Sequence, residues 1–289
     1  MVLLEANNLT KKYKQFTLDD VSLTLEEGKI YGFVGENGSG KSTTMKAITG
    51  LIIPDSGEVK INNKDLKTLT PTEREDISFT LDELCFPEHL KVKSINQIFK
   101  RVFTSWKEEM FLNYLKDFNI DINKKVKELS KGMKAKLNIA IALSHDAKIL
   151  ILDEPMNGLD PVARDEFCDL LIEFVKSGPK RVILISSHII SDLEKICNEF
   201  IFIHRGKILL KENKISLENN FLKITLSNEK FDSFDKNNVI RYKTTADGVE
   251  VLIKNNEENA LFEGATKASA EDIIVFLIRG KTIWKNWWL

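Results

Sequence analysis

Nine consecutive residues have the composition and spacing of a loop that binds phosphate groups. They are Gly35, Glu36, Asn37, Gly38, Ser39, Gly40, Lys41, Ser42 and Thr43, and the first eight match the pattern G-x-x-x-x-G-K-[ST]. An apolar run over 30–34 precedes the loop and a helical pattern follows it, which is the setting that this motif requires. A glycine-rich turn that matches by chance is the alternative, and the flanking strand and helix argue against it.

Each residue type in this loop has a physical reason to be there. Glycines let the backbone N–H groups turn inward around an anion at the start of a helix. Lys41 is expected to reach the β- and γ-phosphates of a nucleotide, and the Ser42 hydroxyl is expected to bind Mg²⁺. The sequence therefore predicts a site for a nucleoside triphosphate with a magnesium ion.

Two adjacent carboxylates follow a second apolar run. Residues 149–152 are all aliphatic, which is typical of a strand buried on both faces of a parallel sheet, and Asp153 and Glu154 come directly after them. Burying carboxylates at such a position costs free energy unless they are paired, hydrogen-bonded or bound to a metal. Because successive strand side chains point in opposite directions, we expect Asp153 to join the Mg²⁺ shell and Glu154 to position an attacking water.

A histidine ends another apolar run. His188 follows the expected strand at 181–187, as Glu154 follows its own strand. A lone histidine is more often structural, but a position at the end of a strand in an α/β sheet favours the crevice where ligands bind. The pattern therefore predicts that His188 and Glu154 face one site.

The elements that position these residues indicate an α/β fold. Residues 2–25 are expected to form short strands of an N-terminal antiparallel β subdomain. A P-loop NTPase core with a mostly parallel sheet is expected to hold the strands at 30–34, 149–152 and 181–187, the helix at 42–51, and a hairpin at 200–204 and 207–210. Two further short strands are expected at 58–61 and 76–81.

Two further segments differ from this core. Residues 83–128 carry apolar residues at helical spacing and predict a helical subdomain inserted into the core, with Trp106 and the phenylalanines as its packing. Beyond residue 212, short expected strands alternate with polar runs, and a helix with a Ser269–Asp272 capping box follows. We therefore predict an ATP-binding domain over 1–212 and a small C-terminal α/β domain over 213–289.

Composition limits the classes of function. The formal net charge is −1, which gives no electrostatic reason to expect a nucleic-acid partner. The three cysteines, Cys85, Cys168 and Cys197, lack the spacing of metal ligands and fit a reducing cytoplasmic setting. No apolar run approaches the roughly 18 residues that can cross a bilayer. A membrane role would therefore depend on a partner.

The order of the short motifs resembles that of the ATP-binding subunit of an ABC transporter, in a bacterial exporter branch. The phosphate loop at 35–42 is followed by LSKGM at 129–133, DEP at 153–155, GLD at 158–160 and SSH at 186–188. The resemblance is strong over about residues 2–210. It is weaker in the tail, where SAEDIIVFLIRG is similar to the closing helix of that branch.

The resemblance implies roles that the residues alone only permit. Local sequence favours a half-buried loop position for Tyr13, whereas the resemblance makes it the aromatic that stacks on adenine. It also implies that Glu154 is the catalytic glutamate and that His188 contacts the γ-phosphate. Ser130 and Gly132 would close on ATP held by a second subunit, and Asp160 would cross the dimer interface.

Three departures from the family pattern qualify these roles. The segment LSKGM at 129–133 corresponds to the family's signature motif, and it has Lys131 and Met133 where glycine and glutamine are commonest. Asn157 replaces the more usual serine before Gly158. The largest departure is Asp82, which stands where the family has a glutamine. Its carboxylate would join the Mg²⁺ shell, which favours oxygen ligands, and we expect it to tune coupling without supplying the essential base.

We therefore expect an ATPase that drives export through separate polytopic membrane (permease) subunits. Two ATPase subunits, identical or paralogous, would close on ATP at the cytoplasmic face of the membrane. A soluble ABC-type ATPase acting on nucleic acid or ribosomes, and a regulatory module that does not hydrolyse ATP, are the alternatives. Phe86 lies in a connecting loop where little core is expected, so we predict that it anchors the membrane subunit.

Overall fold

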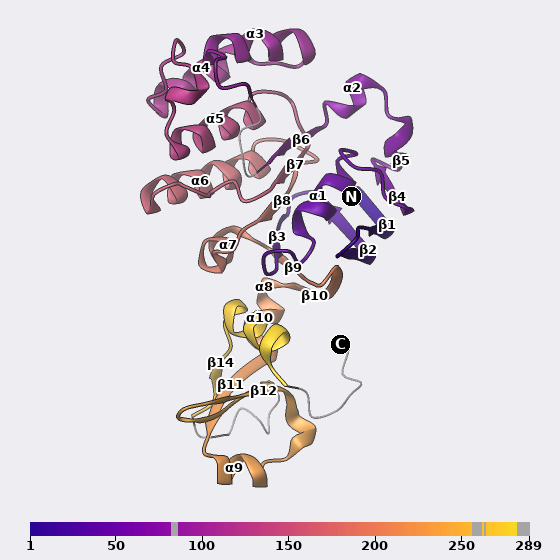
Figure 1. The fold of residues 1–289 in the computed structure, drawn as a ribbon, viewed down its shortest axis with the longest axis vertical. Helices are drawn as coiled ribbons and strands as arrows, with labels where there is room; N and C mark the ends of the chain where they lie inside the picture. The colour runs from indigo at the N-terminus through magenta and orange to yellow at the C-terminus, as the bar shows by residue number, and fades with distance from the viewer. Residues whose placement is uncertain (82–85, 256–261, 263, 282–289) are drawn as a thin grey trace.

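The computed structural model describes residues 1–81, 86–255, 262 and 264–281. Its centre is a six-stranded sheet with strand order β10-β9-β3-β8-β7-β6 (Figure 1). The strands β3, β6, β7, β8 and β9 are parallel, and β10 pairs with β9 in the antiparallel direction. The bounds are β3 Ile30–Val34, β6 Ile77–Thr80, β7 Ile149–Leu152, β8 Val182–Ser186, β9 Glu199–His204 and β10 Lys207–Asn213.

A second, antiparallel sheet lies beside the first and comes largely from the N-terminal residues. Its strand order is β2-β1-β4-β5, with bounds β1 Val2–Lys12, β2 Thr17–Glu26, β4 Ser56–Ile61 and β5 Lys64–Asp65. Helix α1, Lys41–Ile48, contributes Met45 and Ile48 to the hydrophobic core that joins the two sheets. The expected N-terminal strands are confirmed, although β1 and β2 are longer than the short strands predicted.

Helices cover the other face of the central sheet. Helices α6, Pro161–Lys176, and α7, Ile190–Ile196, follow β7 and β8, as crossover connections of a parallel sheet require (Figure 1). Buried side chains of both helices share one hydrophobic core with β3, β7 and β8. This arrangement places the loops that follow β3, β7 and β8 at the same edge of the sheet.

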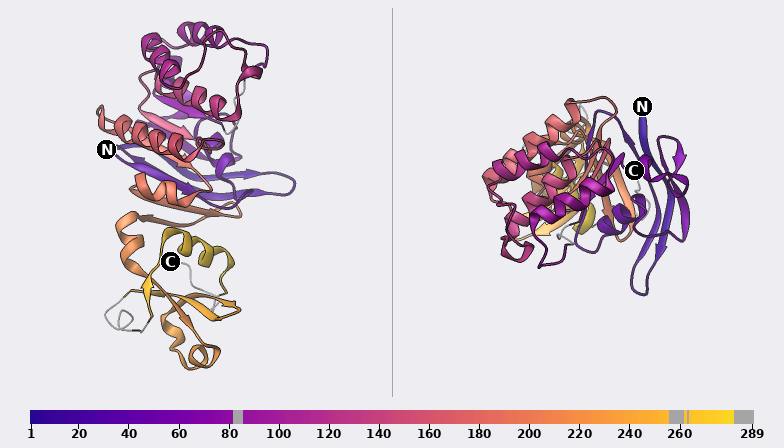
Figure 2. Two further views of the ribbon diagram at one scale, coloured as in Figure 1. Left: turned by 90° about the vertical axis from the view of Figure 1, so that its left-hand side faces the viewer. Right: turned by 90° about the horizontal axis from the view of Figure 1, so that it is seen from above.

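The inserted helical subdomain is confirmed and lies at one end of the molecule (Figure 2). Helices α3 Val92–Val102 and α4 Glu108–Asp117 lie within the predicted 83–128, and α5, Lys131–Leu143, packs against them beyond that range. The short helix α2, Pro71–Arg74, precedes β6. Trp106 packs inside the subdomain as expected, because its ring stacks on Phe99 and its indole N–H donates to Asn96 Oδ1 at 2.9 Å.

The C-terminal residues form a third sheet at the opposite end of the molecule (Figure 2). Its strand order is β12-β13-β11-β14, and α10 faces the central domain (Figure 1). The bounds are α8 Lys214–Asn220, β11 Phe221–Leu226, α9 Asn228–Ser233, β12 Val239–Thr245, β13 Gly248–Lys254, β14 Thr266–Lys267 and α10 Ala270–Arg279. The predicted Ser269–Asp272 capping box begins α10.

The structure bears on two further expectations, which concern membrane-spanning segments and the surroundings of Phe86. No helix in the described residues is long and apolar enough to span a membrane. Phe86 is not isolated in a connecting loop, because it is half-buried and its ring packs edge-on against Phe99 with the centroids 5.9 Å apart. The prediction that little core surrounds Phe86 is therefore wrong, since α3 supplies an aromatic neighbour that the loop sequence does not reveal.

Candidate active site

The phosphate loop joins β3 to α1 and lines a cavity of about 320 Å³. Gly38 and Gly40 adopt left-handed backbone conformations, with φ of 77° and 114°, which glycine reaches without a steric penalty. A Cβ atom at Gly40 would lie 3.0 Å from the Phe16 ring. The cavity is lined by Phe16, Glu36, Asn37, Gly38, Gly40, Lys41, Ser42, Thr43 and Glu154.

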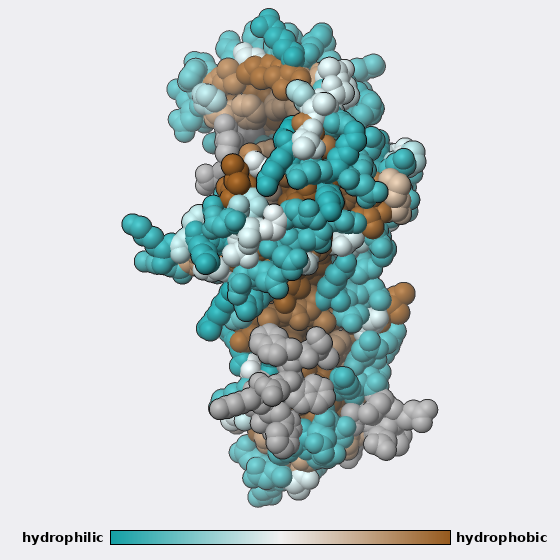
Figure 3. Space-filling view, turned by 90° about the vertical axis from the view of Figure 1, so that its right-hand side faces the viewer, coloured by the Kyte–Doolittle hydropathy of each residue, from teal (hydrophilic) through white to brown (hydrophobic). Residues whose placement is uncertain are grey.

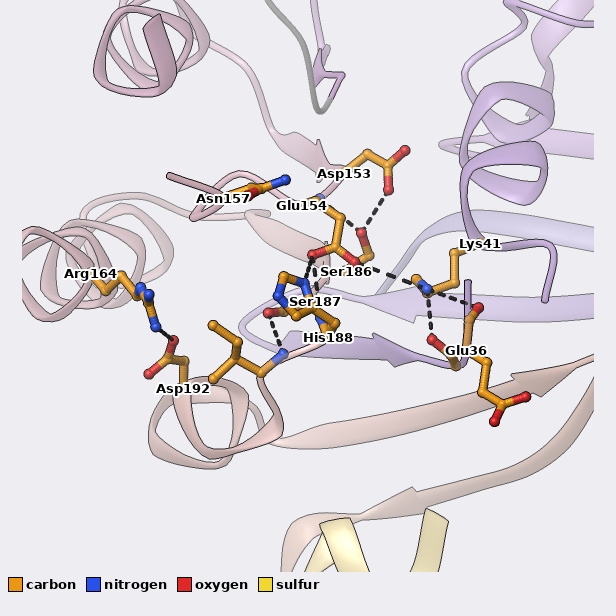
Figure 4. A network of polar contacts seen from close by, with 12 residues as sticks. Glu36, Lys41, Asp153, Glu154, Asn157, Arg164, Ser186, Ser187, His188 and Asp192 are labelled. Atoms are coloured by element: carbon orange, nitrogen blue, oxygen red, sulfur yellow. Dashed lines mark hydrogen bonds and ion pairs between the residues drawn. The ribbon is translucent and has the colours of Figure 1, made fainter. Parts of the chain in front are cut away.

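Lys41 is the buried cation of this cavity, with 6% of its surface exposed. Its Nζ donates to the carbonyl oxygens of Gly35 at 2.6 Å and Glu36 at 3.2 Å, and it lies 4.0 Å from Glu154 Oε1 (Figure 4). Burial lowers the pKa of Lys41, although the nearby Glu154 and Asp153 carboxylates oppose this shift. The ammonium therefore lies where the negative charge of a triphosphate would be strongly favoured.

The two carboxylates after β7 are connected through a serine that the sequence analysis missed. Ser186 Oγ donates to Asp153 Oδ1 at 2.7 Å, and the Glu154 backbone N–H donates to Ser186 Oγ at 2.9 Å (Figure 4). Glu154 has a φ of 48°, which is costly for a residue with a side chain and occurs mostly where the surroundings fix it. Ser186 therefore holds both Asp153 and the backbone of Glu154 in place.

Glu154 and His188 are in direct contact, as their strand-end positions predict. His188 Nδ1 lies 2.8 Å from Glu154 Oε2, and the His188 backbone N–H donates to the same oxygen at 3.2 Å (Figure 4). The histidine side chain is 56% exposed, whereas that of Glu154 is 14% exposed. The glutamate thus lies between Lys41 on one side and His188 on the other.

The residues of the signature and of the GLD motif lie next to each other. Ser130 caps α5 by accepting from the Met133 N–H at 3.2 Å, and a Cβ atom at Gly132 would lie 2.9 Å from the Gly158 carbonyl oxygen. Lys131 Nζ donates to Asn157 Oδ1 at 3.0 Å. The unusual lysine of the signature therefore contacts the asparagine of the other motif, so the two departures from the family pattern form one interaction.

Asp160 has a structural role within the chain. It caps α6 by accepting from the Ala163 N–H at 3.0 Å, and this hydrogen bond holds the pKa of the Asp160 carboxyl below its usual range.

The structure describes the position of Tyr13 but not that of Asp82. Tyr13 is 48% exposed at the turn between β1 and β2, and its ring centroid lies 6.4 Å from that of Phe16. Phe16, which the sequence analysis missed, lines the cavity, and adenine stacking on Tyr13 stays a prediction. Asp82 lies outside the described residues, so its expected role is untested.

A second cavity, of about 310 Å³, lies at β6 between the central sheet and the helical subdomain. Its aromatic lining comes from Phe79, Phe86, Phe99 and Phe103, and His145 lies at the same cavity. Apolar side chains gather at this end of the molecule in the space-filling view (Figure 3). The Phe79 side chain is 40% exposed, so an apolar surface here is open to a partner.

Comparison with known proteins gives consistent matches. A model of the ABC transporter family matches residues 18–157. The lantibiotic transport ATP-binding protein SrtF of Streptococcus pyogenes is 34% identical over 220 residues, which are 75% of this chain and 93% of that protein. The bacitracin transport ATP-binding protein BcrA of Bacillus licheniformis is 30% identical over 309 residues, covering 97% of this chain and 99% of that protein.

A solved structure agrees with these matches. The structure of an ATP-binding subunit of an ABC transporter is 28% identical, with a TM-score of 0.68, and the match covers 75% of this chain and 92% of that chain.

Proposed function

Because the chain belongs to the ABC transporter family, we propose that residues 35–43, Asp153, Glu154 and His188 form its ATP-hydrolysing site. The chain is an ATP-binding and ATP-hydrolysing subunit of a bacterial ABC transporter of the exporter type. The observation that carries the site assignment is the continuous set of contacts from Lys41 through Glu154 to His188.

In this proposal Glu154 is the general base. Its Oε1 faces Lys41 and its Oε2 faces His188, so a water near the γ-phosphate would meet a carboxylate held at both ends. Proton transfer to such a positioned base contributes typically about 10²–10⁴-fold to a rate. Lys41 would exchange its two backbone carbonyl partners for phosphate oxygens, which are stronger partners because they are charged.

The residues present also fit a magnesium ion. Ser42 lines the cavity, and the buried Asp153 directly precedes Glu154, which also lines it, so the loop and the end of β7 each supply an oxygen donor. Mg²⁺ prefers one or two protein oxygens together with phosphate oxygens and water. Bound there, the ion would offset the charge that develops on the phosphates, while Ser186 keeps Asp153 oriented through its hydrogen bond.

The partners follow from the same assignment. We place the signature residues Ser130 and Gly132 against ATP bound by a second ATPase subunit, with Asp160 at the interface between them.

The aromatic cavity beside β6 is where the polytopic membrane subunit would dock, with Phe86 among its anchors, because an aromatic surface at this end of the chain is exposed. The chain would then lie at the cytoplasmic face of the membrane. The proposed domain boundary lies at residues 212–213.

ATP-driven pairing is the test of this function. The Glu154→Gln variant should hold ATP without turnover, and with ATP and Mg²⁺ its mass in light scattering should double from the 33.0 kDa of one chain. Wild-type protein with ADP should stay monomeric. A Glu154→Gln protein that stays monomeric while saturated with ATP would contradict closure of two copies of this chain.

A further inference from the structure

A third cavity joins the C-terminal domain to the active site. It has a volume of about 440 Å³ and lies between α10, the phosphate loop and the residues after β8. Glu36, Asn37 and His188 supply its polar lining. Ile190, Ile274 and Ile278 supply much of its apolar lining. The cavity therefore shares residues with the ATP site on one side and has a small hydrophobic surface on the other.

Helix α10 is held against the catalytic domain at both ends. The Ala270 N–H donates to Glu194 Oε1 on α7 at 2.9 Å, and Arg279 Nε lies 4.0 Å from Glu36 Oε1 in the phosphate loop. Between these points, Ile274 belongs to the same hydrophobic core as Leu193 of α7. Since α7 begins two residues after His188, α10 is packed on the helix that continues from the active site.

A segment elsewhere on the same chain complements this cavity. Val162 in the first turn of α6 is 69% exposed, and it follows Asp160 by two residues. The segment thus presents an apolar side chain beside a carboxylate. The isoleucines match the valine, and the Asn37 amide and the His188 ring are groups that can donate to a carboxylate. The Glu36 carboxylate, which would repel Asp160, already has Arg279 at 4.0 Å and His204 Nδ1 at 3.8 Å from its oxygens.

We propose that α10 forms part of the interface between two copies of this chain, and that Val162 of each copy enters the cavity beside Ile278 of the other. The inference rests on the proposed ATP-driven pairing and adds the C-terminal domain to it. A two-fold arrangement satisfies the requirement, because each copy carries both the cavity and the protruding segment and the contact is made twice. The occupant is a second copy and not a small molecule, since the complementary surface is present on the chain itself.

Substitutions that introduce opposite charges on the two sides of the contact, made in the Glu154→Gln background, test this contact. Val162→Asp and Ile278→Lys should each raise the dissociation constant of the ATP-bound dimer by roughly tenfold or more, because each buries an unpaired charge at the interface. Combining the two substitutions in one chain should recover most of the affinity, since each aspartate would then meet a lysine. Ile215→Asp is the matched control, because Ile215 on α8 is 70% exposed and does not line the cavity.

The outcomes separate this inference from the function on which it rests. If Glu154→Gln itself fails to dimerise with ATP, the proposed pairing is wrong. If it dimerises and both single variants dimerise equally well, α10 is not part of the interface. Loss of dimerisation that the double variant does not recover would also overturn the direct contact, provided that thermal unfolding shows each variant to be folded.

Discussion

Two cavities of nearly equal volume, about 320 and 310 Å³, flank the central sheet and differ in almost every chemical property. The cavity at the phosphate loop has a buried ammonium and a carboxylate 4.0 Å apart, and the Lys41 ammonium donates to the Glu36 carbonyl oxygen. The cavity beside β6 has a mostly apolar lining that includes four phenylalanines and, among the residues that the structure describes, carries no carboxylate or ammonium. A site for chemistry on phosphates needs fixed charges, whereas a docking surface needs apolar anchors.

In the proposed assignment, ATP hydrolysis and docking of the membrane subunit involve different strands of one sheet. Strands β3 and β7 lead into residues that line the polar cavity, and β6, which pairs with β7, borders the aromatic one. Residues 78–80 and 150–152 are therefore direct neighbours across one strand pair. Because β6 pairs directly with β7, a movement of β6 would be transmitted through β7 to Asp153, the residue after that strand.

Replacing the proposed base should give the largest effect. Glu154→Gln removes the charge but keeps the shape, so steady-state ATP turnover should fall about 10²–10⁴-fold. Glu166→Gln, on the exposed face of α6, is the control and should keep wild-type turnover. ATP turnover near the wild-type rate in Glu154→Gln would show that Glu154 is not the general base.

Replacing the buried cation should weaken binding itself. Lys41→Ala removes a charged hydrogen-bond donor from the phosphate loop, and hydrogen bonds to charged groups contribute about 1.5–3 kcal/mol each. We expect ATP affinity to fall roughly 10–100-fold by calorimetry. Lys46→Ala on the same helix should leave affinity unchanged. Equal ATP affinities in Lys41→Ala and wild type would argue against contact between Lys41 and the phosphates.

The aromatic cavity should show the opposite pattern. Phe86→Ala should release the chain from the membrane fraction of cells that express its transporter, while ATP affinity stays at the wild-type value. Phe231→Ala, which alters a half-buried phenylalanine of the C-terminal domain, should leave membrane association intact. If Phe86→Ala stays bound to membranes, the docking surface lies elsewhere.

A pH series tests the apolar character of the second cavity with a smaller effect. Burial lowers the pKa of His145 from 6.5 to about 4, so the unfolded chain binds a proton at higher pH than the folded one. Stability from this neutral histidine is therefore complete above about pH 6.5 and is lost as the pH falls toward 4. His145→Phe should reduce the loss of unfolding free energy between pH 7 and pH 5 by about 2 kcal/mol in urea titrations. An unchanged pH slope would mean that His145 is solvated.

Much of the fold and of the polar site could be predicted because the information is local. The phosphate loop and Asp153-Glu154 are contiguous motifs at strand ends, and the position of His188 after a strand was enough to place it beside Glu154. Helical spacing likewise revealed the inserted subdomain.

The remaining features depend on contacts between distant segments. Ser186 joins Asp153 to the backbone of Glu154, and Arg279 reaches Glu36 from the far end of the chain. A serine in an apolar strand and an arginine at a helix end carry no local signal of such contacts. The half-buried position of Phe86 has no local signal for the same reason, because its neighbour Phe99 lies on another element.

The central claim is that this chain binds ATP at the phosphate loop and cleaves it through Glu154. The most direct measurement is the identity of the nucleotide that remains bound after Glu154→Gln is incubated with ATP and Mg²⁺ and passed rapidly through a desalting column. We predict that chromatography of the released nucleotide will show intact ATP, whereas wild-type protein treated in the same way will yield ADP. ADP on the Glu154→Gln protein, or no nucleotide on either protein, would contradict the account.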